Sequence, residues 1–191
     1  MVNLVENKNK MEKNTSSSKF QKGLETKINE ALEKYFQSTK KIKLNLSKDQ
    51  YLKLDYKDGV QMKVQPDVCD TENQIFGEIY TCGEKLLAGQ QRKVGTDMLK
   101  LLTIEKLIKE SQNKDIQKLI ILTSYDSEHT ENNLKIDLKL EVSKKLLGPA
   151  SWKIKAMELF GFEVLIYFLD SKEKKELDET RTKQGEKFKN K

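Results

Sequence analysis

Two short apolar segments, each preceded by a helical pattern, constrain the fold of this chain most strongly. Residues 117–124 (QKLIILTS) form a brief aliphatic run of the kind found in a buried strand. Residues 162–170 (FEVLIYFLD) form a second such run, directly after an expected helix over 151–161 that Gly161 ends. Helices that alternate with buried strands are typical of an α/β domain.

The amino-terminal half completes this pattern. An amphipathic helix is expected over residues 20–36, followed by strand-like alternation over 49–68 with a turn at YKDG. A long helical pattern runs from about Gly89 to Ser111. The segment 134–147 fits either a strand or a helix, after a polar loop over 125–133. The order of elements predicts an α/β fold with a mixed central β-sheet flanked by helices on both faces.

Length and charge set the domain boundaries. The 191 residues suffice for one domain, expected over 19–170, with a disordered polar segment at 1–18 and a charged tail at 171–191. The net charge of +6 lies mainly on these two ends, so it does not by itself indicate nucleic-acid binding. No apolar run reaches the roughly 20 residues of a membrane span, and no secretion signal opens the chain. We therefore expect a cytoplasmic or nucleoid-associated protein that is not secreted.

A hairpin at residues 65–83 (QPDVCDTENQIFGEIYTCG) carries the first candidate site residues. A turn centred on Glu72 and Asn73 places Asp67 opposite Glu78, with Cβ atoms about 4.5–5.5 Å apart. Two carboxylates at that separation repel each other unless a cation lies between them, and Mg²⁺ suits such oxygen ligands. The alternative is that Asp67 ends a strand while Glu78 faces solvent.

The helix after this hairpin offers the cation. At about 100° per residue, Lys93, Asp97 and Lys100 fall inside its apolar stripe, and Gln90 lies on the same face. Charges on a buried face cost several kcal/mol unless they are paired. We expect Lys100, with Lys93 second, to face the acids of the hairpin. The alternative is an ordinary ion pair between Lys93 and Asp97 at the helix margin.

Together these segments resemble the PD-(D/E)xK nuclease superfamily, the restriction-endonuclease-like fold, over roughly residues 20–170. The matching elements are the initial helix, Pro66-Asp67, Glu78-Ile79-Tyr80 after a ten-residue interval, the following helix, and the later strands. The chain is similar to a variant subgroup in which Tyr80 occupies the usual lysine slot. Such variants commonly take their lysine from the following helix.

The resemblance implies a metal-dependent DNA endonuclease that hydrolyses phosphodiester bonds. A restriction-type endonuclease is one form of this expectation. Asp67 and Glu78 correspond to the ligands of Mg²⁺ or Mn²⁺, and Lys100 or Lys93 substitutes for the catalytic lysine. Gln90, Asp97 and Tyr80 are expected to support them. Glu25, on the first helix, lies where some relatives carry another acid.

Three functions remain open at this stage. Besides the endonuclease, the chain fits a catalytically inactive nuclease fold that binds nucleic acid or protein, a reading that Tyr80 favours. A structural protein with an internal ion network is the third. DNA is the expected partner, no membrane is expected, and a homodimer is left open. A zinc site is not expected from one histidine and two distant cysteines.

Overall fold

The computed structural model describes residues 3–6, 16–46, 50–56, 59–82, 86, 88–125, 136–137, 145–148 and 152–189. Every helix and strand expected between residues 20 and 124 is present. In chain order the elements are β1 (Asn3–Glu6), α1 (Ser16–Tyr35), the π-helical turn η1 (Phe36–Lys40), β2 (Gln50–Asp55), β3 (Gln61–Val64), β4 (Val68–Asp70), β5 (Ile75–Tyr80), α2 (Ala88–Gln112), β6 (Gln117–Ser124), β7 (Ile136–Asp137), α4 (Trp152–Leu159), β8 (Phe162–Phe168) and α5 (Ser171–Lys189).

The central sheet has five strands within the described residues, in the order β4-β5-β6-β8-β7. Strands β5, β6 and β8 run parallel, whereas β4 and β7 pair antiparallel at the two edges. Strands β1, β2 and β3 form a separate antiparallel sheet. The chain is therefore a mixed α/β protein with a mixed central sheet, as the order of sequence patterns predicted.

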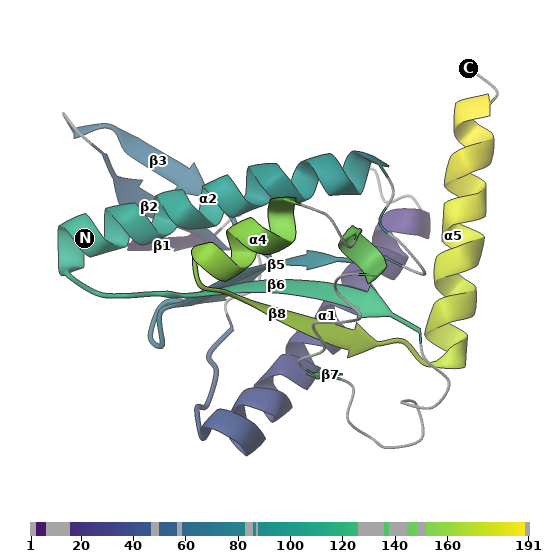
Figure 1. Cartoon of the computed structure of the whole chain (residues 1–191), viewed down its shortest axis with the longest axis horizontal. Coiled ribbons are helices and arrows are strands. Elements are labelled where there is room, and N and C mark those ends of the chain that lie inside the picture. The colour runs from purple at the N-terminus through teal and green to yellow at the C-terminus, as the bar shows by residue number, and fades with distance from the viewer. Residues whose placement is uncertain are drawn as a thin grey trace.

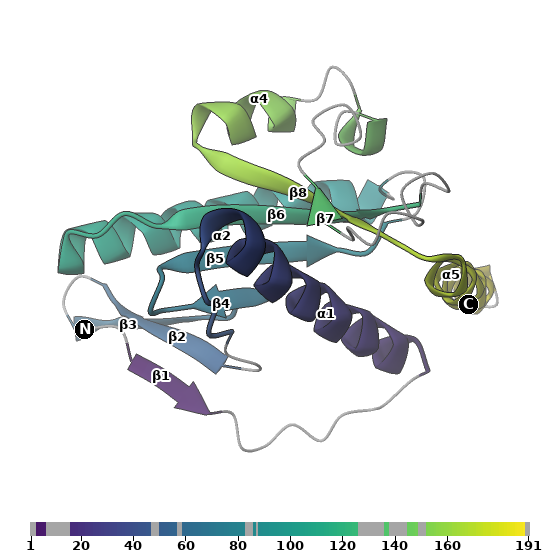
Figure 2. The same ribbon diagram turned by 90° about the horizontal axis from the view of Figure 1, so that it is seen from below.

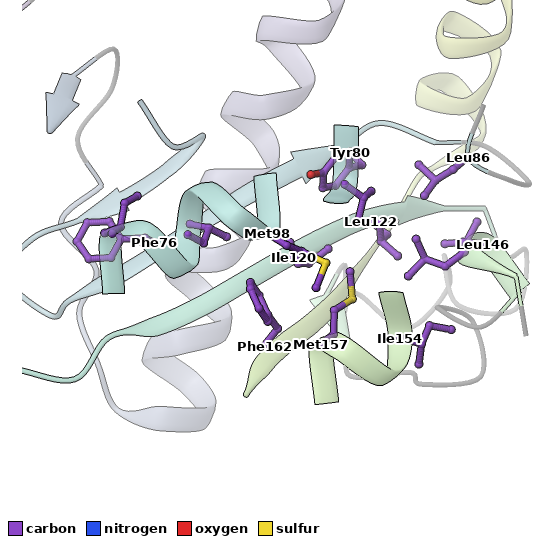
Figure 3. Close-up of a cluster of buried hydrophobic side chains, with 14 of the residues drawn as sticks. Phe76, Tyr80, Leu86, Met98, Ile120, Leu122, Leu146, Ile154, Met157 and Phe162 are labelled. Atoms are coloured by element: carbon purple, nitrogen blue, oxygen red, sulfur yellow. The ribbon is translucent and has the colours of Figure 1, made fainter. Parts of the chain in front are cut away.

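Helices cover both faces of the central sheet. Side chains alternate along β5, so Phe76 and Tyr80 enter one buried cluster with α2 and α4, whereas Ile75 and Ile79 enter the other with α1. Figures 1 and 2 show α1 and α2 on opposite sides of the sheet. Figure 3 shows the cluster on the α2 side, where β5, β6 and β8 meet α2 and α4. Burial on both faces explains why these strands are continuous apolar runs.

The structure corrects the expected boundary at the amino terminus. Residues 3–6, expected to be disordered, form β1 and pair antiparallel with β2. The α1 helix also begins earlier than expected, at Ser16. Strand β2 is paired to β3 on its other side, so β1 completes the backbone hydrogen bonds of an edge that is otherwise open.

The carboxyl-terminal boundary also differs from the expectation. Residues 171–189 form α5, whose Glu173 and Leu177 are buried and which packs against α1. Asp170 caps the helix by accepting the backbone N–H of Glu173 at 2.8 Å, and Glu173 in return accepts that of Asp170 at 3.0 Å. Glu173 also forms an ion pair with Lys27 of α1. The start of this expected tail is thus part of the domain.

Two further segments complete the comparison with the sequence. Trp152 is 62% exposed, because α4 turns Ile154 and Met157 toward the sheet instead. Of the ambiguous segment 134–147, the structure describes the strand β7 and a helical stretch at 145–147. The expected loop over 125–133 lies outside the described residues except for Tyr125.

Candidate active site

The site begins at the β4–β5 hairpin. The ladder pairs Val68 with Gly77, which confirms the register expected from the turn, and Asp67 lies directly before the first paired residue of β4. Asp67 accepts a hydrogen bond from the backbone N–H of Ile79 at 3.0 Å, which holds its carboxylate beside β5. Asp67 is exposed and Glu78 is fully buried. One acid therefore faces solvent while its neighbour lies under the helix.

Glu78 points toward α2 because side chains at alternate positions of a strand lie on the same face. It shares a face with Phe76 and Tyr80, which pack beneath α2. On the helix, Val94, Leu101 and the apolar residues after them are buried, whereas Lys93, Asp97 and Lys100 occupy the amino-terminal half of the same side. The charged part of α2 thus lies over the one acid of β5.

Two of the lysines of α2, Lys93 and Lys100, contact Glu78. The Nζ atom of Lys100 lies 2.5 Å from Oε1 of Glu78, and that of Lys93 lies 3.7 Å from Oε2. Lys100 also donates to the backbone carbonyl of Gln65 at 3.3 Å, just before Asp67. Lys100 is the nearer ammonium, as expected. Its side chain is 23% exposed, against 55% for Lys93.

Asp97 joins the two lysines to Tyr80. Its Oδ2 accepts a hydrogen bond from the Tyr80 hydroxyl at 2.7 Å and lies 2.9 Å from Nζ of Lys93. Its Oδ1 lies 3.5 Å from Nζ of Lys100. The Lys93 ammonium also lies over the Tyr80 ring, 5.2 Å from its centroid. The ion pair between Lys93 and Asp97 was the alternative considered for this helix face, and the structure shows it together with the contacts to Glu78.

Burial changes the proton affinities of the site. Desolvation, reinforced by the negative charge of Asp67, raises the pKa of Glu78 to about 8, although Lys100 acts in the opposite direction. Desolvation lowers the pKa of Lys93, but its hydrogen bond to Asp97 and the nearby acids outweigh that effect and raise it. Burial and the hydrogen bond to Asp97 raise the pKa of Tyr80. Tyr80 therefore stays a neutral donor.

Asp67 and Glu78 are the acids of the site that could hold a hard divalent cation. Among the described residues, the cationic groups next to Glu78 are the ammonium groups of Lys100 and Lys93, at 2.5 and 3.7 Å. No cluster of three or more His, Cys, Asp or Glu suited to a metal occurs among those residues. Mg²⁺ is commonly held by one or two carboxylates, with water and substrate phosphate as its other ligands. Asp67 and Glu78 match that donor set.

Thr81, directly after β5, marks the edge of the site. Its backbone carbonyl accepts hydrogen bonds from Nε2 of Gln90 at 2.9 Å and from Nη2 of Arg181 on α5 at 3.3 Å. Gln90 was expected near the site, whereas Arg181 was not, because α5 was assigned to a tail. Glu25 lies on α1, which packs against the opposite face of the sheet, and its role stays a prediction.

Comparisons with family models, with curated proteins and with solved structures found no significant match to this chain. Among the described residues, no helix combines the length and apolar character needed to cross a membrane. The function is therefore inferred from the geometry of the site.

Proposed function

We propose that this protein is a metal-dependent DNA endonuclease with a restriction-endonuclease-like core, which hydrolyses phosphodiester bonds. The observation that carries the proposal is the meeting of Asp67, Glu78 and Lys100. An acid directly before β4, an acid on β5 and an ammonium from the next helix are the groups that metal-assisted phosphodiester hydrolysis requires. The order of helices and strands, with this hairpin followed by α2, β6 and β8, agrees with the proposal.

Asp67 and Glu78 would hold the metal. When bound there, Mg²⁺ or Mn²⁺ would lower the pKa of water and neutralise charge on the phosphate. Lys100, held between Glu78 and the carbonyl of Gln65, directs its positive charge at the acid pair and stabilises negative charge that develops there. Lys93 is more exposed and can reach a phosphate that approaches from solvent.

A second candidate function is an inactive nuclease fold that binds nucleic acid without cleaving it. The observation that favours it is Tyr80, which fills the strand position where the resemblance calls for a lysine. Its hydroxyl is committed to Asp97, so that position supplies no cation to the acids.

Incubation with supercoiled plasmid DNA tests the first proposal. Wild-type protein should nick or cut DNA with Mg²⁺ or Mn²⁺ and not with EDTA. Lys100→Ala should slow cutting by about 10²–10³-fold, the usual cost of removing one group that stabilises developing charge. Lys106→Ala, a change on the same helix at a side chain that is 74% exposed, is the matched control and should cut normally.

The outcomes separate the two candidates. DNA binding in EDTA with no cutting in either metal would select the binding module. Normal cutting by Lys100→Ala would refute the role given to this lysine. A parallel reaction with single-stranded RNA of the same sequence establishes whether DNA is the preferred substrate.

A further inference from the structure

Asp97 occupies an unusual position for an acid on a helix. Only 6% of the residue is exposed, yet its carboxylate contacts two lysines and a tyrosine. Of the three acids near these lysines, Asp67 and Glu78 are the proposed metal ligands. Asp97 is the one of the three that is not assigned to the metal.

The metal makes this distinction important. A dication held by Asp67 and Glu78 would repel ammonium groups nearby, and it would compete with Lys100 for the carboxylate of Glu78. Lys100 would then retain the carbonyl of Gln65 and the charge of Asp97, 3.5 Å away. Lys93 would retain Asp97 at 2.9 Å.

We propose that Asp97 is a positioning residue that keeps the ammonium groups of Lys100 and Lys93 beside the acid pair when the metal is bound. The proposal rests on the endonuclease function proposed above. Asp97 acts through the lysines and is not itself a metal ligand.

Tyr80 takes part in the same network of contacts around Asp97. It donates its hydroxyl hydrogen to Oδ2 of Asp97 at 2.7 Å, and this buried bond fixes the carboxylate. Tyr80 therefore supplies no ammonium group itself. It orients Asp97, which contacts the ammonium groups of Lys93 and Lys100 on α2. In this account Tyr80 is compatible with activity and does not mark its loss.

The test uses Asp97→Asn, which keeps the shape of the side chain and removes its charge. We expect kcat for DNA cleavage to fall about 10–100-fold, the usual effect of removing a group that orients the residues around a metal. The change in KM should be smaller than the change in kcat. A second measurement does not depend on activity: Mg²⁺ should raise the melting temperature of the variant as it does that of the wild type, because Asp67 and Glu78 are intact.

Two further variants complete the experiment. Tyr80→Phe should lower kcat by about two- to tenfold, because Asp97 loses the hydrogen bond that orients its carboxylate. This variant also carries the test if Asp97→Asn does not fold. Glu110→Gln, on the same helix with a side chain that is 59% exposed, is the control for charge removal and should cut normally.

Each other outcome overturns the inference in a recognisable way. If folded Asp97→Asn or Tyr80→Phe cuts with the wild-type kcat, the positioning role is refuted while the endonuclease stands. If Asp97→Asn loses its response to Mg²⁺ as well, Asp97 acts on the acid pair and not on the lysines. If the wild type cuts no DNA, the proposed function fails and this inference fails with it.

Discussion

Glu78→Gln should make this protein more stable at alkaline pH, an unusual expectation for a change in a proposed active site. Glutamine copies the shape of a protonated glutamate and carries no charge at any pH. The wild-type carboxyl is fully buried, and burial together with the charge of Asp67 raises its pKa from 4.5 to about 8. The folded protein therefore holds this proton more tightly than the unfolded chain does.

The sign and size of the effect follow from this difference. Between pH 4.5 and pH 8 the folded state binds more protons at Glu78 than the unfolded state, so the free energy of unfolding of the wild type falls as pH rises. The slope is about 1.4 kcal/mol per pH unit, and the loss reaches about 5 kcal/mol at pH 8. Glu78→Gln has no such loss. Relative to the wild type, the variant gains stability from pH 4.5 to about pH 8, and the difference is constant above.

Urea unfolding followed by circular dichroism at 222 nm measures this difference. Both proteins are unfolded at pH 5, 6, 7, 8 and 9 in EDTA, so that no divalent metal holds Glu78 in its ionised form. Glu110→Gln is the control, since its side chain is 59% exposed and the change should give a nearly constant difference over this range. A difference between Glu78→Gln and the wild type that is flat from pH 5 to pH 8 would refute the reasoning. It would mean that the lysines of α2 keep Glu78 ionised in the folded protein.

Three further changes test the fold that carries the site. Gly77→Ala should destabilise the protein by about 1–3 kcal/mol, because the new Cβ would lie 2.8 Å from the Cβ atom of Leu119 on β6. The control Gly89→Ala places its Cβ where no atom lies within 4 Å, so it should be neutral or slightly stabilising. Chemical unfolding of both variants measures the difference. Asp170→Ala should lower the free energy of unfolding by about 1 kcal/mol, because α5 loses its amino-terminal cap. Urea unfolding compares this variant with Asp178→Ala, a change at an exposed position of the same helix. Equal effects of the two changes would refute the capping role. Leu101→Ala, at a fully buried position of α2, should cost about 2–5 kcal/mol by the same assay, and a cost below 1 kcal/mol would contradict its place in the core.

Local patterns predicted the parts of the site that are close in sequence. The turn at residues 72–73 fixes which residues oppose each other in an antiparallel pair, so the register of β4 and β5 followed from counting. The helical period similarly placed Lys93, Asp97 and Lys100 on the side of α2 that faces the sheet. The contact of Lys100 with Glu78 then required only that helix and hairpin pack together.

Contacts between segments that are distant in the sequence could not be predicted from local patterns. The short strand β1 shows little pattern by itself and is defined by the open edge of β2. The docking of α5 had a local indication in the sequence Asp170-Ser-Lys-Glu173, which matches a capping box, but its ion pair with Lys27 spans 146 positions. Arg181 could not be assigned to the edge of the site for the same reason. The hydrogen bond from the Tyr80 hydroxyl to Asp97 depends on the distance at which β5 and α2 pack, and local patterns do not give that distance.

A Mg²⁺ titration of thermal stability tests the central claim most directly. If Asp67 and Glu78 bind the ion, Mg²⁺ at a hundred times its dissociation constant stabilises the wild type by about 2.7 kcal/mol. For a domain of this size that is a rise in melting temperature of about 5–10 °C. Glu78→Ala should show no such rise. Equal rises in both proteins, or none in the wild type, would contradict the metal site.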